Sequence, residues 1–212
     1  MQQIYLDNAA TTPVRPEVEE VMQPYFCEKY GNPSGIYKMA SECRQALETV
    51  RKQIGKTLKV SAEEIYFTSG GTESDNWAIK STAQRLKEKG KHIITSKIEH
   101  HAVLNSCAYL ETQGFEVTYL DVDEWGCVRF DALQRAIRKD TILISIMYAN
   151  NEVGTIQPIG QIGKIAKEND IFFHTDAVQA YGQIPIDVKR ENIHLLLSLI
   201  HISEPTRLDV IS

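Results

Sequence analysis

Four short polar stretches in this sequence contain side chains that could bind a ligand or move a proton. Each of them follows a run of apolar residues that is typical of a buried strand. The stretches are TSGGTESDN (68–76), TSKIEHHAV (95–103), ANNEVGT (149–155) and FFHTDAVQA (172–180). In open parallel α/β sheets, ligands bind beyond the carboxyl ends of the strands. Because all four stretches follow strands, we expect their side chains to form one shared site.

The first stretch could hold a phosphate. Two glycines, Gly70 and Gly71, allow a tight turn with close backbone approach, and Thr72 is expected to begin a helix. Free N–H groups and the positive end of the helix dipole would attract an anion there. The alternative is an ordinary helix start with Thr or Ser as its cap.

The second stretch places His100 and His101 at the start of a helix. An imidazole in that position could stack on a planar ligand or transfer a proton. The alternative is a pair of solvated histidines on the first turn of the helix.

The last two stretches offer an amide and a carboxylate. Asn150 and Asn151 could recognise a hydroxyl or carboxylate of a ligand, although Asn is also an ordinary turn residue. Asp176 ends a strongly apolar strand, where an unpaired carboxylate is costly. Its partner would be helix N–H groups, a basic side chain or a protonated ligand nitrogen.

Together these groups favour one class of ligand. A planar heteroaromatic phosphate ester with a basic ring nitrogen would use the phosphate seat, the imidazole, the amide and the carboxylate at once. Pyridoxal phosphate is such a molecule.

The elements that must position these residues alternate between strands and helices. Apolar runs predict strands at 64–68, 92–96, 116–120, 141–147, 171–176 and 193–197. Helices are expected at 16–28, 40–58, 72–89, 100–113, 131–139 and 159–169. Several of the strands are apolar at every position, as in strands covered on both faces. The pattern predicts an α/β fold with a mostly parallel sheet and helices on both sides.

Composition excludes several other classes. The 212 residues carry a formal net charge of −5, which gives no support for binding nucleic acid or an anionic membrane. The N-terminus lacks the features of a secretory signal, and no window approaches the length of a membrane span. We therefore expect a cytoplasmic protein. The spacings of its four cysteines match no zinc site, so we expect free thiols and no metal.

Six segments together resemble a known family. They are YLDNAATTP, YGNPSG, FTSGGTESDN, HIITSKIEHHAVL, ILISIMYANNEVGTIQPI and FHTDAVQAYGQIPIDV. In sequence and order they are similar to the NifS/IscS-type cysteine desulfurases, pyridoxal-phosphate enzymes of the class-V aminotransferase group. The resemblance runs from about Ile4 to Leu196. It implies a three-layer α/β/α domain like the large domain of fold-type-I pyridoxal-phosphate enzymes, incomplete here.

The resemblance also implies roles for individual residues. Gly71 and Thr72 would hold the cofactor phosphate, and His100 would stack on the ring and take part in proton transfer. Asn151 and Gln179 would face the ring hydroxyl. Asp176 would pair with the protonated ring nitrogen, which makes the ring a stronger electron acceptor.

The reaction implied by the family converts L-cysteine to L-alanine and leaves sulfur as an enzyme persulfide. A lysine holds the cofactor, and a mobile cysteine attacks the substrate sulfur. The sulfur then passes to an iron–sulfur scaffold protein or another acceptor, and the full-length enzyme is expected to be a homodimer. The alternatives are another enzyme of the same group, such as a selenocysteine lyase or an aminotransferase-like relative, and a non-catalytic fragment.

The end of the chain departs from the family. The cofactor lysine should stand in a pattern close to S-x-H-K, and the corresponding residues 199–202 read LIHI, with Ile202 at the lysine position. None of the four cysteines lies at the position of the nucleophile. We therefore expect the chain as given to be inactive. Its expected parts are an arm (1–15), a partial large domain with the first helix of the small domain (16–196), and a non-matching tail (197–212).

The tail is expected to be foreign sequence joined to the gene, and re-amplification of the genomic locus tests this expectation. Reverse-translated with suitable codons, LSLIHISEPTR (197–207) resembles the transposase adapter used in DNA library preparation. We expect the genomic reading frame to leave the printed sequence near Leu196 and to continue into the family's lysine motif. Genomic DNA that reads through the tail unchanged would contradict this expectation.

Overall fold

The computed structural model describes residues 4–199 and 210–211, and in them the chain forms one seven-stranded sheet. The strands lie in the order β1-β7-β6-β5-β4-β2-β3. Their bounds are β1 Tyr66–Phe67, β2 His92–Ser96, β3 Glu116–Leu120, β4 Thr141–Ser145, β5 Phe172–Asp176, β6 Leu195–Ser198 and β7 Val210–Ile211. Strands β6, β5, β4, β2 and β3 are parallel, and β7 pairs antiparallel with both β1 and β6. The predicted α/β fold is confirmed.

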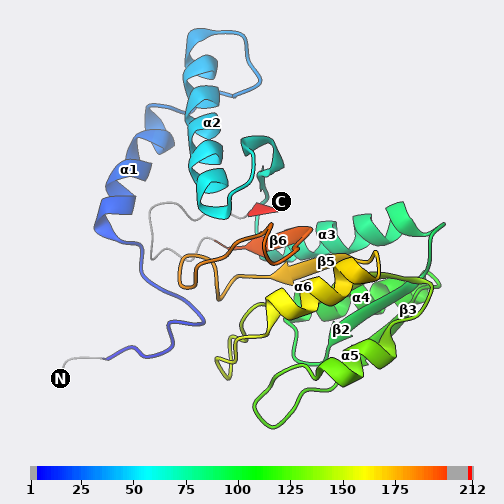
Figure 1. Cartoon of the computed structure of the whole chain (residues 1–212). Helices are drawn as coiled ribbons and strands as arrows, with labels where there is room; N and C mark the ends of the chain where they lie inside the picture. The colour runs from blue at the N-terminus through cyan, green and yellow to red at the C-terminus, as the bar shows by residue number, and fades with distance from the viewer. Residues whose placement is uncertain (1–3, 200–209, 212) are drawn as a thin grey trace.

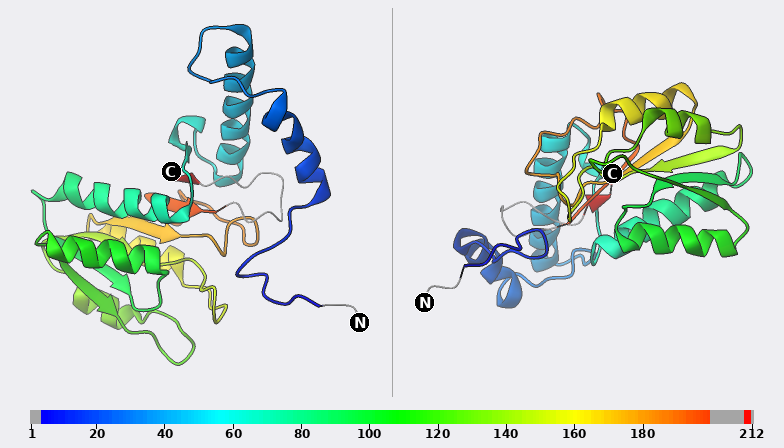
Figure 2. Two further views of the ribbon diagram at one scale, coloured as in Figure 1. Left: turned by 180° about the vertical axis from the view of Figure 1, so that it is seen from behind. Right: turned by 90° about the horizontal axis from the view of Figure 1, so that it is seen from below.

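Helices cover both faces of the parallel strands. Helices α3 (Gly71–Leu86) and α4 (His101–Thr112) pack on one face, and α5 (Phe130–Ala136) and α6 (Ile159–Glu168) on the other (Figures 1 and 2). Helices α1 (Pro16–Cys27) and α2 (Lys38–Leu58) stand to one side of the sheet (Figure 1).

The strands are apolar at consecutive positions because both of their faces are covered. Ile93 and Leu143 belong to the core cluster that packs against α3 and α4. Their neighbours Ile94 and Ile144 belong to the cluster that packs against α5 and α6. Successive strand residues point to opposite faces. A sheet with helices on both sides therefore requires an apolar residue at each of these positions.

Several boundaries differ by a few residues from those expected from the sequence, and two of them bear on the site. The predicted strand 64–68 is reduced to Tyr66–Phe67, because Glu64 ends a short 3-10 helix (Ala62–Glu64). Ser61 caps that turn, and the Glu64 carboxylate accepts the backbone N–H of Ser61 at 2.7 Å. This capping box favours a helical turn over an extended strand. Helix α3 also begins one residue earlier than expected, at Gly71.

The strand β6 continues to Ser198, two residues beyond the point where the family resemblance was expected to end. Leu197 and Ser198 are both buried. The expected lysine position, residue 202, lies outside the described residues. No helix within residues 4–199 is both long enough and apolar enough to cross a membrane.

An added methyl group is expected to change the stability of the fold in opposite directions at two glycines of α6. A Cβ on Gly163 would overlap the backbone carbonyl of Glu191, whereas a Cβ on Gly160 would meet the Glu191 side chain at an ordinary 3.9 Å. We expect Gly163→Ala to lower the free energy of unfolding by about 2–3 kcal/mol through overpacking. Gly160→Ala should raise it by about 0.5–1 kcal/mol through helix propensity. Urea denaturation measures both, and equal effects would contradict the packing described for α6.

Candidate active site

A cavity of about 290 Å³ lies at the carboxyl ends of the parallel strands. Strand β3 lies on one side of β2, and β4 lies on the other side, so the chain reverses its direction of winding between β2 and β4. Such a switch point is the usual place for ligands in open α/β sheets. The cavity is lined by all six residues to which the family resemblance assigned a role: Gly71, Thr72, His100, Asn151, Asp176 and Gln179.

The start of α3 forms one wall of the cavity and presents backbone N–H groups to it. Gly70 is the N-cap residue, and it provides no side-chain hydrogen bond to the first turn. Capping by Ser or Thr, the alternative interpretation of this stretch, is therefore not observed. Gly71 packs closely, since an added Cβ would lie 3.0 Å from the Leu199 side chain. The arrangement leaves an uncapped helix N-terminus facing the cavity, which suits an anion.

His100 is the N-cap of α4 and lines the cavity with an imidazole of defined orientation. Its Nδ1 accepts the backbone N–H of Ala102 at 3.1 Å. The neutral ring therefore carries its proton on Nε2, and that N–H is free to donate. His101, the other histidine of this stretch, is the first residue of α4 and is exposed.

The two asparagines have different surroundings. The Oδ1 of Asn150 accepts the N–H groups of Glu152 and Val153, each at 2.9 Å. Its Nδ2 donates to the Ile98 carbonyl at 3.1 Å. Asn150 is thus the turn-forming residue, whereas Asn151 is exposed and lines the cavity.

Asp176 ends β5 and is buried, with 6% of its surface exposed. Its Oδ1 accepts the N–H of Val178 at 2.9 Å. Burial raises the pKa of this carboxyl group, and the Val178 N–H and the nearby His100 partly oppose that shift. Close by, the Nε2 of Gln179 donates to the Ala9 carbonyl at 3.2 Å, which places the N-terminal arm beside the cavity.

Sequence reasoning did not single out Glu99, which joins two strands at the switch point. One of its carboxylate oxygens accepts the Ser96 hydroxyl at 2.6 Å and the Met147 N–H at 3.0 Å. Burial raises the pKa of Glu99 to about 8 despite these two hydrogen bonds. Its position directly before His100 was the available signal.

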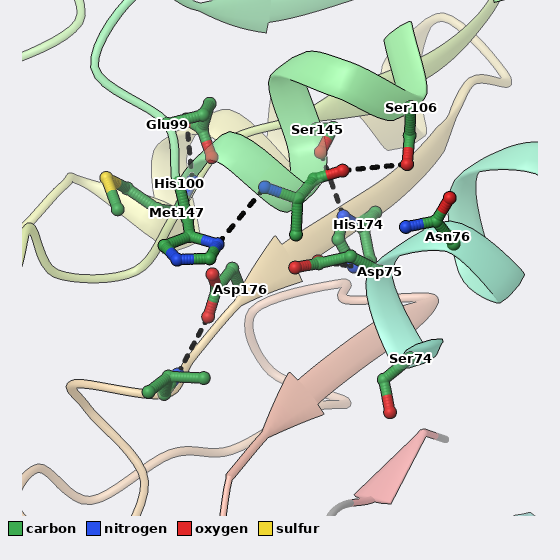
Figure 3. A network of polar contacts seen from close by, with 12 residues as sticks. Ser74, Asp75, Asn76, Glu99, His100, Ser106, Ser145, Met147, His174 and Asp176 are labelled. Atoms are coloured by element: carbon green, nitrogen blue, oxygen red, sulfur yellow. Dashed lines mark hydrogen bonds and ion pairs between the residues drawn. The ribbon is translucent and has the colours of Figure 1, made fainter. Parts of the chain in front are cut away.

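Asp75 and His174 were also missed. Asp75 lines the cavity, and its Oδ1 lies 3.6 Å from the Nε2 of His174 (Figure 3). Burial raises the pKa of Asp75 to about 9, and the charges of Asp176 and Glu99 add to the shift. Burial lowers the pKa of His174 to about 4. Spacing could have indicated both residues, because Asp75 follows Thr72 by about one helical turn and His174 shares a strand face with Asp176.

The four cysteines are free thiols, as predicted: Cys27, Cys43, Cys107 and Cys127. Cys107 is fully buried in α4, and burial raises the pKa of its thiol to about 12. A nucleophilic cysteine needs a thiolate near neutral pH. Cys107 is therefore a packing residue.

Curated relatives support the family suggested by the sequence. The Aminotransferase class-V family model matches residues 4–200. A cysteine desulfurase IscS from Methanosarcina thermophila is 64% identical over 193 residues, covering 91% of this chain and 48% of that protein. A cysteine desulfurase IscS from Dictyoglomus turgidum is 58% identical, covering 92% of this chain and 50% of its own length. This chain therefore spans about half the length of the curated relatives it matches.

Solved structures agree with this relationship. A NifS-like protein has a TM-score of 0.94 and 39% identity, covering 99% of this chain and 58% of that one. A structure of SspA in complex with cysteine has a TM-score of 0.93 and 42% identity, covering 98% and 60%. The resemblance to NifS/IscS-type cysteine desulfurases is thus confirmed. The chain belongs to the class-V aminotransferase family, whose cysteine desulfurase members are pyridoxal-phosphate enzymes.

Proposed function

We propose that this chain is the cofactor-binding part of a cysteine desulfurase, which converts L-cysteine to L-alanine and carries the sulfur onward as an enzyme persulfide. One observation carries the proposal. The uncapped start of α3, the His100 imidazole and the Asp176 carboxylate line the same cavity. The relatives named cysteine desulfurase and the structure of SspA in complex with cysteine support the choice of substrate.

The residues present fit pyridoxal phosphate. The cavity volume of about 290 Å³ is near the lower end of the range for small-molecule sites. The α3 N-terminus offers Gly71 and Thr72 to a phosphate, while Asp176 offers a buried carboxyl group with few partners to a basic ring nitrogen. Asn151 and Gln179 offer amides to a ring hydroxyl.

Each of these residues has a definable task. Thr72 and the adjacent N–H groups would fix the anionic end of the cofactor. Asp176 would hold a proton at the ring nitrogen, because a buried carboxylate favours a neighbouring positive charge. His100 would donate or accept a proton at Nε2, since its Nδ1 is already engaged by Ala102. When bound, pyridoxal phosphate supplies a ring that withdraws electrons from the substrate carbon.

The location, the oligomeric state and the sulfur acceptor of the full-length enzyme are proposed from the family. The full-length enzyme would be a cytoplasmic homodimer that passes sulfur to an iron–sulfur scaffold protein or another acceptor. The division into an arm (1–15), a partial large domain (16–196) and a tail (197–212) also remains a proposal. A non-catalytic role for the printed chain is the second candidate, and Ile202 at the lysine position favours it.

Binding of pyridoxal phosphate tests the assigned roles. We expect Asp176→Asn to weaken binding at least tenfold, because it removes the charge that faces the ring nitrogen. Thr72→Val should weaken it about three- to tenfold through the loss of one hydrogen bond. Absorbance and fluorescence titrations measure the dissociation constants.

Asp131→Asn is the matched control, because Asp131 is an exposed aspartate on α5 with arginine partners. Its affinity should equal that of the wild type. Wild-type affinity in Asp176→Asn would contradict the assignment of Asp176.

An assay of L-cysteine turnover tests whether Ile202, at the position of the cofactor lysine, leaves the chain inactive. We expect the 212-residue chain to release no sulfide and form no alanine from L-cysteine, with or without added pyridoxal phosphate. Borohydride treatment should leave no cofactor linked to residue 202, because isoleucine has no amine. The IscS of Methanosarcina thermophila, assayed in parallel, is the positive control. Sulfide release by the 212-residue chain would overturn the expectation.

A further inference from the structure

Two buried polar atoms face each other behind the cavity without hydrogen bonds. The Oδ1 of Asp75 and the Nε2 of His174 lie 3.6 Å apart, and neither has a hydrogen-bond partner among the described residues. Their side chains are 2% and 0% exposed (Figure 3). Unsatisfied buried polar atoms are rare, because each has given up its hydrogen bonds to water without gaining a new partner. One proton between these two atoms would satisfy both after a small rotation of the carboxyl group.

The other ring nitrogen of His174 has a partner. Its Nδ1 lies 2.9 Å from the Ser145 hydroxyl on the neighbouring strand β4. A hydroxyl can either donate or accept, so this contact alone allows both neutral tautomers of His174. The state of Asp75 therefore decides which nitrogen carries the proton.

The titratable groups around Asp75 and His174 are two carboxyl groups, a thiol and one further histidine. Asp176 approaches it from β5, and Glu99 from the connection between β2 and α4. Cys107 approaches from α4, and burial keeps it a neutral thiol. His100 lies beside Asp176 (Figure 3). No lysine or arginine in residues 4–199 forms an ion pair with these carboxyl groups, so little opposes their mutual repulsion.

We propose that Asp75 and His174 share one buried proton, so that their pair is electrically neutral and Asp176 alone presents a negative charge to the ligand. The net charge does not depend on which partner holds the proton: a carboxylic acid with a neutral imidazole and a carboxylate with an imidazolium both sum to zero. Loss of that proton would place two carboxylates along one cavity, where each disfavours ionisation of the other. Asp75 is thus a positioning residue for Asp176.

The hydrogen bonds balance in this arrangement. The Asp75 hydroxyl donates to His174 Nε2, and the Nδ1–H of His174 donates to the Ser145 hydroxyl. Each buried atom then has one partner, and no proton has to enter or leave when a ligand binds. The inference rests on the proposed function only for the nature of the ligand, a cofactor with a basic ring nitrogen.

The pH dependence of unfolding tests the shared proton without any ligand. Asp75→Asn keeps the shape and the neutrality of a protonated Asp75. The pKa of Asp75 is raised on folding, so its contribution to stability is full below its ordinary pKa of 3.8 and is lost as the pH rises towards about 9. The unfolding constant of the wild type relative to Asp75→Asn should therefore rise about tenfold per pH unit between about pH 5 and 8. A ratio independent of pH would overturn the proposal.

The protonation of His174 gives an independent measurement. Nitrogen-15 NMR of the labelled chain distinguishes the two ring nitrogens. We expect a proton on Nδ1, with Nε2 either accepting from Asp75 or protonated as well. Asp75→Asn should keep the Nδ1–H form, because its amide can donate to Nε2. A wild-type ring protonated on Nε2 alone would show that Asp75 is an unprotonated carboxylate and would overturn the proposal.

Pyridoxal phosphate then tests which carboxylate carries the charge. The affinity lost in Asp176→Asn should exceed the loss in Asp75→Asn at least tenfold, because only Asp176 faces the ligand as an anion. Equal losses would contradict this part. If the wild type does not bind pyridoxal phosphate at all, the proposed function fails, while the unfolding and NMR measurements still decide whether Asp75 and His174 share a proton.

Discussion

Three carboxyl groups are buried together at the carboxyl edge of the parallel sheet, on Asp75, Glu99 and Asp176. A buried carboxylate must be compensated by hydrogen-bond donors, by a cation or by its own protonation. Within residues 4–199 no lysine or arginine forms an ion pair with them. Each group instead uses what the local backbone and neighbouring side chains provide. Glu99 accepts hydrogen bonds from a hydroxyl and an N–H group, Asp176 accepts the N–H of Val178, and Asp75 lies 3.6 Å from the His174 ring.

The surrounding architecture buries these three carboxyl groups. Helices cover both faces of the sheet, which is why the strands are apolar at consecutive positions. The same packing buries the carboxyl groups at the strand ends, and burial raises their pKa. The polar residues of the site are therefore coupled to the hydrophobic core. Glu99 illustrates the coupling, because its two hydrogen bonds join the ends of β2 and β4 at the switch point. Its side chain therefore links the two strands directly beside His100, which lines the cavity.

Local sequence patterns predicted much of this structure, because apolar runs and turn residues report directly on strands and their ends. Six of the residues that line the cavity could be found because each follows such a run or belongs to a motif of the family. Asp75 lies in the same motif as Gly71 and Thr72 but was not singled out, since an aspartate within a helix is usually solvated. Its burial depends on the packing of α3 against the sheet and α4, which are contacts between distant parts of the chain. The 3-10 turn before β1 was missed because its capping box outweighed a short apolar run.

The pairing register of β5 has a consequence for folding. Ser145 pairs with His174, and His174 in turn pairs with Leu195. Side chains alternate between the faces of a strand, so a slip of one residue would turn His174 and Asp176 towards the opposite helices and bring Phe173 and Thr175 to the site. The groups that form the cavity are also supplied by segments far apart in the sequence, from Gly71 to Leu199. Such long-range pairing is slow to form. Any ligand of the cavity would consequently bind only chains in which the central strands have already paired in the correct register. Binding would therefore stabilise the correctly paired chains over those with a shifted register.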